Sequence, residues 1–141
     1  MNANETISKS KIQLNGISHF GLNVANMKRA ERFYTEVLGF PVIMRSETKG
    51  GLQHIEVDAG NVAIALFEQP QLDLKTAHKI MTEDGYLHFA FDGSYDRFDA
   101  TLQALKEGGV KMDGEPRDWG KSVSVYFHDP DGHQLEINFT K

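Results

Sequence analysis

The chain has 141 residues, of which 40% are hydrophobic and 25% are charged, so it can bury the core of one ordinary globular domain. Its formal net charge of -5 argues against binding to nucleic acid or to an anionic membrane surface, because both need a basic face. The chain contains no cysteine, which excludes disulfides, zinc–thiolate sites and a cysteine nucleophile. Any bound metal must therefore be held by nitrogen and oxygen atoms.

The start of the chain is polar and differs in character from the rest. We expect residues 1–11 to form a flexible tail and residues 12–141 to form one domain. The tail lacks the hydrophobic segment of a signal peptide, and no apolar run reaches the length that crosses a membrane. The sequence therefore predicts a cytoplasmic protein that has neither a membrane nor a nucleic-acid partner.

Two histidines occupy equivalent places in an internal repeat. When His19 is aligned with His88, an offset of 88 − 19 = 69 residues, Gly39 falls on Gly108. Each histidine is followed at the same distance by an amphipathic stretch that stops at glycine. The sequence thus predicts two copies of one structural unit.

The first unit is expected over 17–70, a connector over 71–84 and the second unit over 85–140. In the first unit, helical spacing of apolar residues follows the strand at His19, with Asn26 as the N-cap and Gly39 as the stop. We expect three strands next, over 40–46, 52–57 and 62–67. The connector is expected to hold a short helix over 74–80. The second unit repeats the order, with a strand over 87–91, a helix over 96–107 and strands over 110–112, 122–128 and 134–139.

Strand alternation places the side chains that could bind a metal or transfer a proton on one face of the sheets. Apolar residues point to the other face, which the helices need for burial. The polar face collects His19, His88, Tyr126 and Glu136. A half-buried sheet whose polar side meets water would show the same alternation. If the fold brings them together, two imidazoles and one carboxylate would make a divalent-metal site with open coordination positions.

Two segments carry a family resemblance: 126–136, with its Asp-Pro-Asp-Gly turn, and 33–40. With them the chain resembles, over 17–139, the vicinal oxygen chelate superfamily. This superfamily includes glyoxalase I, extradiol dioxygenases, fosfomycin-resistance enzymes and bleomycin-resistance proteins. The resemblance implies an α+β fold in which two βαβββ modules form a curved mixed sheet with a cleft.

The resemblance also implies the residues of the site. His19, His88 and Glu136 match the metal ligands, and the ion would be Fe2+, Mn2+, Zn2+, Ni2+ or Co2+. Tyr126 and Glu136 match the catalytic residues, which would act on a small-molecule substrate with neighbouring oxygens. We expect a homodimer, since small relatives commonly pair the first module of one chain with the second module of another. The connector is equally compatible with modules that pair within one chain.

The first module departs from two branches of the superfamily. At the place of a fourth ligand in glyoxalase I, the chain offers Ile64 or Ala65, and the nearest carboxylate, Glu68, lies at the end of its strand. Gly21 replaces the polar residue of the fosfomycin enzymes. These departures weaken the expectation of a glyoxalase I or a fosfomycin reaction.

The connector and the second module give a ranking of reactions. Only five residues follow Glu136, so the chain as given lacks the basic C-terminal extension that the fosfomycin enzymes use. Ring-cleaving dioxygenases use additional histidines, and at the matching places this chain has Asp73 and Arg117. We rank a metal-dependent enzyme with extradiol-type ring cleavage first. The alternatives are a glyoxalase-like lyase or isomerase, a fosfomycin-type thiol transferase, and a metal-free binding protein of the bleomycin-resistance kind.

Overall fold

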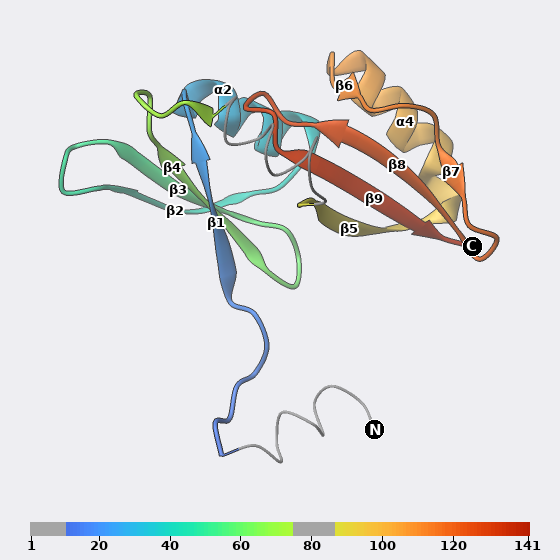
Figure 1. Cartoon of the computed structure of the whole chain (residues 1–141), viewed down its shortest axis with the longest axis horizontal. Coiled ribbons are helices and arrows are strands. Elements are labelled where there is room, and N and C mark those ends of the chain that lie inside the picture. The colour runs from blue at the N-terminus through green and yellow to red at the C-terminus, as the bar shows by residue number, and fades with distance from the viewer. Residues whose placement is uncertain (1–10, 75–86) are drawn as a thin grey trace.

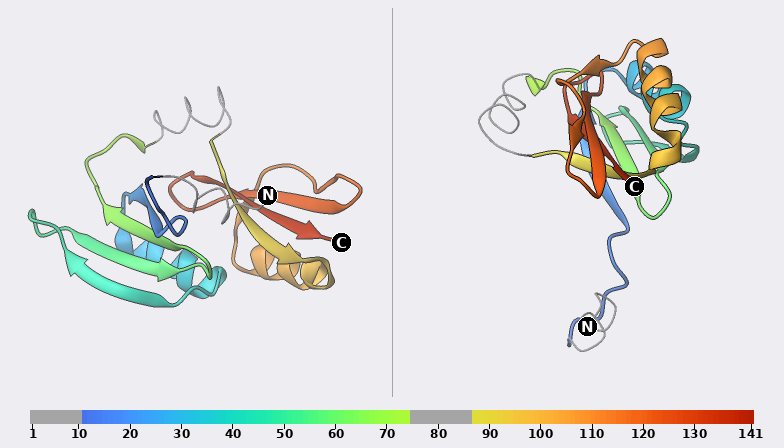
Figure 2. Two further views of the ribbon diagram at one scale, coloured as in Figure 1. Left: turned by 90° about the horizontal axis from the view of Figure 1, so that it is seen from below. Right: turned by 90° about the vertical axis from the view of Figure 1, so that its right-hand side faces the viewer.

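The computed structural model describes residues 11–74 and 87–141, which form two units that lie side by side (Figures 1 and 2). The first unit contains β1 (His19–Val24), α2 (Met27–Arg32), η1 (Phe33–Val37), β2 (Val42–Glu47), β3 (Gln53–Asp58) and β4 (Ala63–Glu68). The second contains β5 (Phe89–Ser94), η3 (Tyr95–Arg97), α4 (Phe98–Glu107), β6 (Lys111–Met112), β7 (Arg117–Asp118), β8 (Ser122–His128) and β9 (Gln134–Thr140). None of the described helices is both long and apolar enough to cross a membrane.

Each unit builds a mixed sheet in which the first and last long strands are parallel. The strand order is β1-β4-β3-β2 in the first sheet and β5-β9-β8-β6 in the second. β1 runs parallel to β4, and β5 runs parallel to β9, while the other pairs are antiparallel. The shared topology confirms the predicted fold of two βαβββ modules. The short β7, which pairs with β8, was not predicted.

Apolar side chains on one face of each sheet form the core. Along β9, Leu135, Ile137 and Phe139 are buried at every second position, and Val125 and Phe127 of β8 are buried beside them. This period of two puts the apolar side chains on one face, while Ser124 and Glu136 are buried on the other. The opposite face of the second sheet carries Tyr126 and Glu136, two of the candidate site residues.

The first helix begins as predicted but changes its pitch before it ends. The side chain of Asn26 accepts a hydrogen bond from the backbone of Arg29 at 2.9 Å, and that of Glu68 accepts one from the backbone of Met27 at 2.8 Å. These bonds satisfy two amides of the first turn. The helix then widens into the π-helical segment η1, after which Gly39 turns the chain at φ 79°. Glu68, at the end of β4, therefore caps this helix.

A buried polar network fastens the second unit to the first. Asp129, 4% exposed, accepts a hydrogen bond from the Tyr34 hydroxyl at 2.7 Å, and the same carboxylate oxygen lies 2.7 Å from Nδ1 of His133. Its other oxygen accepts from the backbone amides of Asp131 at 3.0 Å and His133 at 2.9 Å. Asp131 in turn accepts from the backbone amide of Ala25 at 2.9 Å. The predicted turn is thus also the joint between the units.

This joint makes folding stability depend on pH. Burial acts to raise the pKa of Asp129, but its hydrogen bonds and its attraction to His133, with the bond from Tyr34, outweigh burial and hold that pKa below the usual 3.8. Burial raises the pKa of Tyr34 well above 10.0, so its hydroxyl keeps the proton that it donates. A carboxyl with a lowered folded-state pKa contributes stability above its unfolded-state pKa, and this contribution is lost as pH falls through the folded-state pKa.

We therefore expect Asp129→Asn to be less stable than wild type at pH 7, with a difference that narrows as pH falls below about 4. Urea unfolding at a series of pH values and one fixed protein concentration measures this difference. The exposed Asp96→Asn is the matched control and should show no such narrowing. A constant difference between pH 7 and pH 3 would contradict the assignment of Asp129.

Most predicted segments differ from the observed ones by one to three residues at an end, and two of these differences matter here. The strand expected over 87–91 is β5, so His88 lies one residue before it. The helix expected over 96–107 begins as the tight turn η3 at Tyr95 and becomes α-helical at Phe98. The expected tail over 1–11 and the helix over 74–80 lie almost wholly outside the described residues.

Candidate active site

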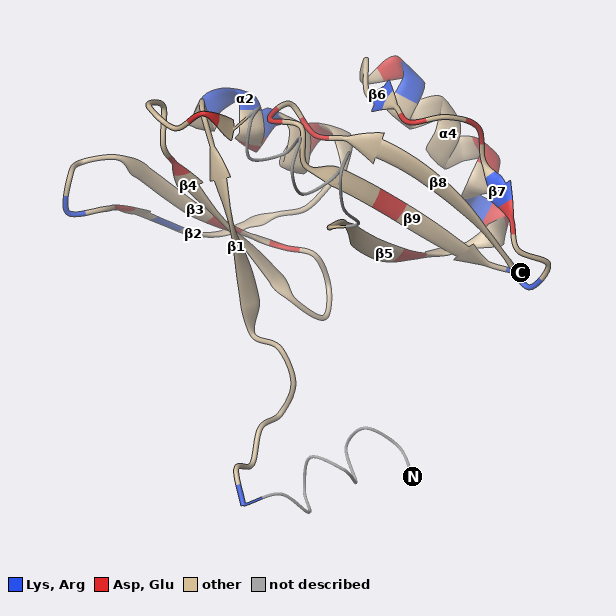
Figure 3. Ribbon diagram, in the orientation of Figure 1, with Lys and Arg blue, Asp and Glu red and all other residues tan. Residues whose placement is uncertain are grey.

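Strand register brings three of the candidate residues to one face of the second sheet. Glu136 of β9 pairs with Tyr126 of β8, and paired residues point to the same face. His88 reaches that face from the residue before β5, and its Nε2 lies 3.0 Å from Oε1 of Glu136. The ring centroids of His88 and Tyr126 are 6.2 Å apart. Figure 3 shows one acidic band in the middle of β9, where Glu136 is the sole acidic residue.

Both carboxylate oxygens of Glu136 have partners. The residue is 7% exposed, and an unpaired carboxylate would be costly there. Its Oε1 faces His88, and its Oε2 accepts a hydrogen bond from the Ser124 hydroxyl at 2.5 Å. Ser124 accepts from Nε1 of Trp119 at 3.0 Å and from Nδ2 of Asn138 at 2.9 Å. Sequence reasoning did not single out Ser124 and Asn138, although their strand parity places both on the face of Glu136.

His19 does not join this group within the chain. It is the exposed first residue of β1, and its Nδ1 lies 3.0 Å from the Ser18 hydroxyl. Among residues 11–74 and 87–141, no three His, Asp or Glu side chains lie where they could together hold a metal ion. One chain therefore brings together His88 and Glu136 of the predicted triad and leaves its third member on the other sheet.

The His88 and Glu136 atoms fit a divalent metal ion. Two ligands about 2.1 Å from an ion and at right angles to each other lie about 3.0 Å apart. The Nε2 to Oε1 distance of 3.0 Å matches this spacing, although a hydrogen bond would also have it. Imidazole and carboxylate are also ligands that first-row transition metals accept. The pair could thus hold one side of an ion that needs a further ligand.

The first sheet lacks the fourth ligand of glyoxalase I. Ala65 pairs with Gly21, two residues after His19, and so occupies the face of His19, while Ile64 belongs to the core. A Cβ atom on Gly21 would lie 3.2 Å from the ring of Phe67. Next to His19 this face therefore carries Gly21, Ala65 and Phe67, and Glu56, which pairs with Ala65, follows across the sheet.

A cleft of about 700 Å³ lies between the starts of β1 and β5. Phe20 and Phe89 stack in it with ring centroids 4.5 Å apart, and His88 and Asp92 supply polar groups. Ile17, which is 74% exposed, stands at its edge. The cleft is thus lined by one of the site residues, His88.

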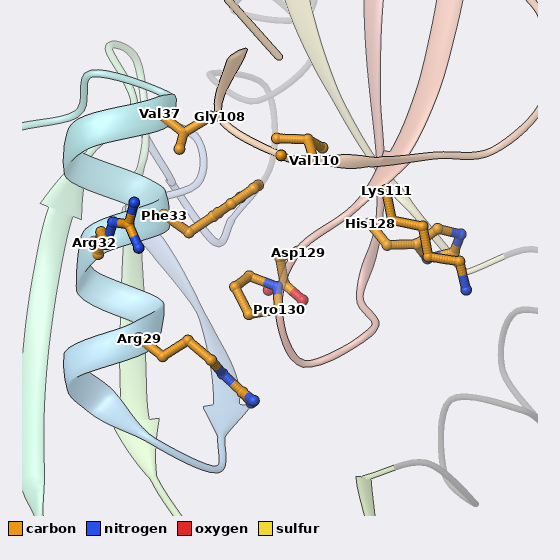
Figure 4. Close-up of a pocket in the computed structure, with 11 residues that line it drawn as sticks. Arg29, Arg32, Phe33, Val37, Gly108, Val110, Lys111, His128, Asp129 and Pro130 are labelled. Carbon is orange, nitrogen blue, oxygen red and sulfur yellow. The ribbon is translucent and has the colours of Figure 1, made fainter. Parts of the chain in front are cut away.

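A second hollow of about 360 Å³ lies between α2 and the turn at Asp129 (Figure 4). Its arginines have acidic partners, since Arg29 lies 2.8 Å from Asp131 and Arg32 lies 3.2 Å from Glu36. The hollow therefore follows the joint between the units, and we assign it no ligand.

Comparisons with known sequences give close relatives over most of the chain. The metallothiol transferase FosB of Staphylococcus haemolyticus is 31% identical over 129 residues, which cover 89% of this chain and 84% of the relative. FosB of Shouchella clausii is 32% identical over 128 residues, covering 89% and 80%. The glutathione transferase FosA of Serratia marcescens is 28% identical over 125 residues, covering 89% and 81%.

Solved structures share the fold. The fosfomycin resistance protein FosX of Listeria monocytogenes matches with a TM-score of 0.75 at 24% identity, covering 92% of this chain and 96% of its own. A glyoxalase family protein of Enterococcus faecalis matches with a TM-score of 0.72 at 23% identity, covering 88% and 97%. The sequence model of the Glyoxalase/Bleomycin resistance protein/Dioxygenase superfamily matches residues 16–137. The predicted resemblance is confirmed, and the chain belongs to this superfamily.

Proposed function

We propose that this protein is a divalent-metal-dependent transferase that joins a thiol to a small substrate with neighbouring oxygens. The observation that carries the proposal is the His88–Glu136 pair, in a chain whose relatives include metallothiol transferases. A FosX variant was solved with Mn(II) and 1S,2S-dihydroxypropylphosphonic acid, so Mn(II) is our first choice of ion. These similarities favour thiol transfer, an alternative in the sequence analysis, over the ring cleavage that was ranked first.

We further propose that two chains complete the site in a homodimer. Within the described residues, β1 pairs only with β4 and β5 only with β9, so each has an edge without a strand partner. Beside the two histidines, Ile17 and Leu87 are 74% and 46% exposed. Open edges with exposed apolar side chains are typical contact surfaces. In such a dimer, His19 of one subunit would join His88 and Glu136 of its partner.

The remaining side chains of the polar face suggest how a substrate is held. A bound divalent ion would supply Lewis-acid stabilisation of negative charge on oxygen. Arg117 pairs with Ser124 across β7 and β8, so it belongs to the polar face and can meet an anionic group. Tyr126, opposite Glu136, can donate a hydrogen bond or a proton to a substrate oxygen.

The proposed reaction on an epoxide is a substitution at carbon. The thiol first gives its proton to water. The thiolate sulfur then forms a bond to one epoxide carbon while the bond from that carbon to oxygen breaks, and the electron pair remains on oxygen. That oxygen then takes a proton, for which Tyr126 is our candidate donor, and the phenol regains its proton from water. The product carries one thioether and one hydroxyl group, and the reaction needs no oxidant or reductant.

We expect Mn(II)-loaded protein to convert fosfomycin and either glutathione or cysteine into a thiol adduct with a new 31P NMR resonance. Conversion should stop with EDTA and return with Mn(II), and Tyr126→Phe should slow it by about 100-fold. Formation of the diol without a thiol adduct would overturn thiol transfer in favour of hydrolysis. Oxygen consumption by Fe(II)-loaded protein with catechol, without reaction on fosfomycin, would overturn it in favour of ring cleavage.

A further inference from the structure

Glu136 accepts a hydrogen bond from Ser124, a residue that neither the sequence motifs nor the similarities to known proteins single out. Ser124 pairs with Asn138 across β8 and β9, so it is the diagonal neighbour of Glu136 on the same face. It is 0% exposed, and its hydroxyl lies 2.5 Å from Oε2 of Glu136. The oxygen that faces His88 is the other one, Oε1. The serine therefore contacts the carboxylate on the side away from the imidazole.

The bonding capacity of a hydroxyl fixes the direction of this hydrogen bond. A serine hydroxyl has one proton and two lone pairs. The indole Nε1 of Trp119 can only donate, and it does so to Ser124 at 3.0 Å. Asn138 donates to Ser124 at 2.9 Å and to Ser122 at 3.1 Å. With both lone pairs engaged, the Ser124 proton points to Glu136.

We propose that Ser124 is a positioning residue that turns Oε1 of Glu136 toward the metal, with Trp119 and Asn138 fixing the direction of its hydroxyl. This inference rests on the proposed role of Glu136 as a ligand. A carboxylate held at one oxygen loses less freedom when its other oxygen binds an ion, because its orientation is already set. Ser124 thereby increases metal affinity without touching the metal or the substrate.

Mn(II) affinity, measured by calorimetric titration, is expected to fall by different amounts in three serine variants. Ser124→Ala should bind about 10- to 100-fold more weakly than wild type, as other partners of metal ligands do. Ser124→Thr, which keeps the hydroxyl, should restore affinity to within about threefold. Ser122→Ala is the matched control: its hydroxyl also accepts from Asn138 but is not among the partners of Glu136, and its affinity should stay within about twofold.

Trp119 offers a spectroscopic readout, because it is the single tryptophan of the chain and is 57% exposed. Saturating Zn(II), which is diamagnetic, should change tryptophan emission in wild type and leave it nearly unchanged in Ser124→Ala. Trp119→Phe removes one donor to Ser124 at an exposed site, so it should fold normally and weaken Mn(II) binding by about two- to fivefold.

The outcomes separate this inference from the proposed function. Glu136→Ala with wild-type affinity would overturn the ligand assignment itself. Loss of binding in Glu136→Ala, together with unchanged binding in Ser124→Ala, would overturn the role of Ser124 alone. If Ser124→Ala does not fold, the other two variants decide. The role of Ser124 would be overturned if Trp119→Phe bound Mn(II) as tightly as wild type while Ser124→Thr, which keeps the hydroxyl, lost affinity.

Discussion

Asp129→Ala is expected to lower the free energy of unfolding by about 3–5 kcal/mol. The carboxylate accepts hydrogen bonds from the Tyr34 hydroxyl and from the backbone amides of Asp131 and His133, and it also contacts the His133 ring. Each buried donor that loses its acceptor costs about 1–3 kcal/mol. Because Tyr34 belongs to the first unit and Asp129 to the second, the loss also loosens the contact between the units.

Urea unfolding followed by circular dichroism, at one fixed protein concentration, measures this loss. Asp96→Ala is a suitable control at an exposed site and should change stability by no more than about 0.5 kcal/mol. Tyr34→Phe removes one of the bonds and should lower stability by about 1–2 kcal/mol, less than Asp129→Ala. An Asp129→Ala protein as stable as Asp96→Ala would contradict the structural role of the turn.

Mn(II) binding is expected to fall by more than about 100-fold in both Glu136→Ala and His19→Ala, since losing a ligand should cost more than losing the partner of a ligand. For Glu136 the reason is its position 3.0 Å from His88. For His19 the reason is the proposed dimer, because His19 does not join a metal-holding group within the described part of its own chain. Calorimetric titration with Mn(II) measures both losses.

His54→Ala is the control for these losses, since His54 lies on β3 with its ring 4.0 Å from that of Phe67. It removes an imidazole from the same sheet as His19 without removing a proposed ligand. Its affinity should stay within about threefold of wild type. Equal Mn(II) binding by His19→Ala and wild type would contradict the role of His19.

Local patterns predicted most helices and strands because each element depends on nearby residues, while their arrangement in two βαβββ modules came from the family resemblance. Helical spacing with Asn26 as a cap placed the start of α2, and the alternation Leu135, Ile137 and Phe139 placed β9 and its buried face. The segment η1 was not predicted, because apolar spacing does not distinguish an α-helix from a π-helical continuation of it. The two-residue β7 carries too short a pattern to be read from sequence.

The site could be predicted only in part, because its contacts join distant segments. Parity placed His88, Tyr126 and Glu136 on the polar face, and the structure brings these three together. The bond between Ser124 and Glu136 depends on the register of β8 and β9, which no local pattern fixes. In the proposed dimer, the place of His19 depends on how the chains assemble, and the sequence left two arrangements open.

Complementation between defective chains tests most directly whether two subunits share the site. His19→Ala and Glu136→Ala chains are mixed by co-expression, purified as dimers and titrated with Mn(II). In a shared site, a mixed dimer keeps one intact site, built from His19 of the Glu136→Ala chain and from His88 and Glu136 of the other, so an equal mixture should regain about one quarter of the wild-type sites. Thiol transfer should return in the same proportion. A mixture that binds no more Mn(II) than either variant alone would contradict the shared site.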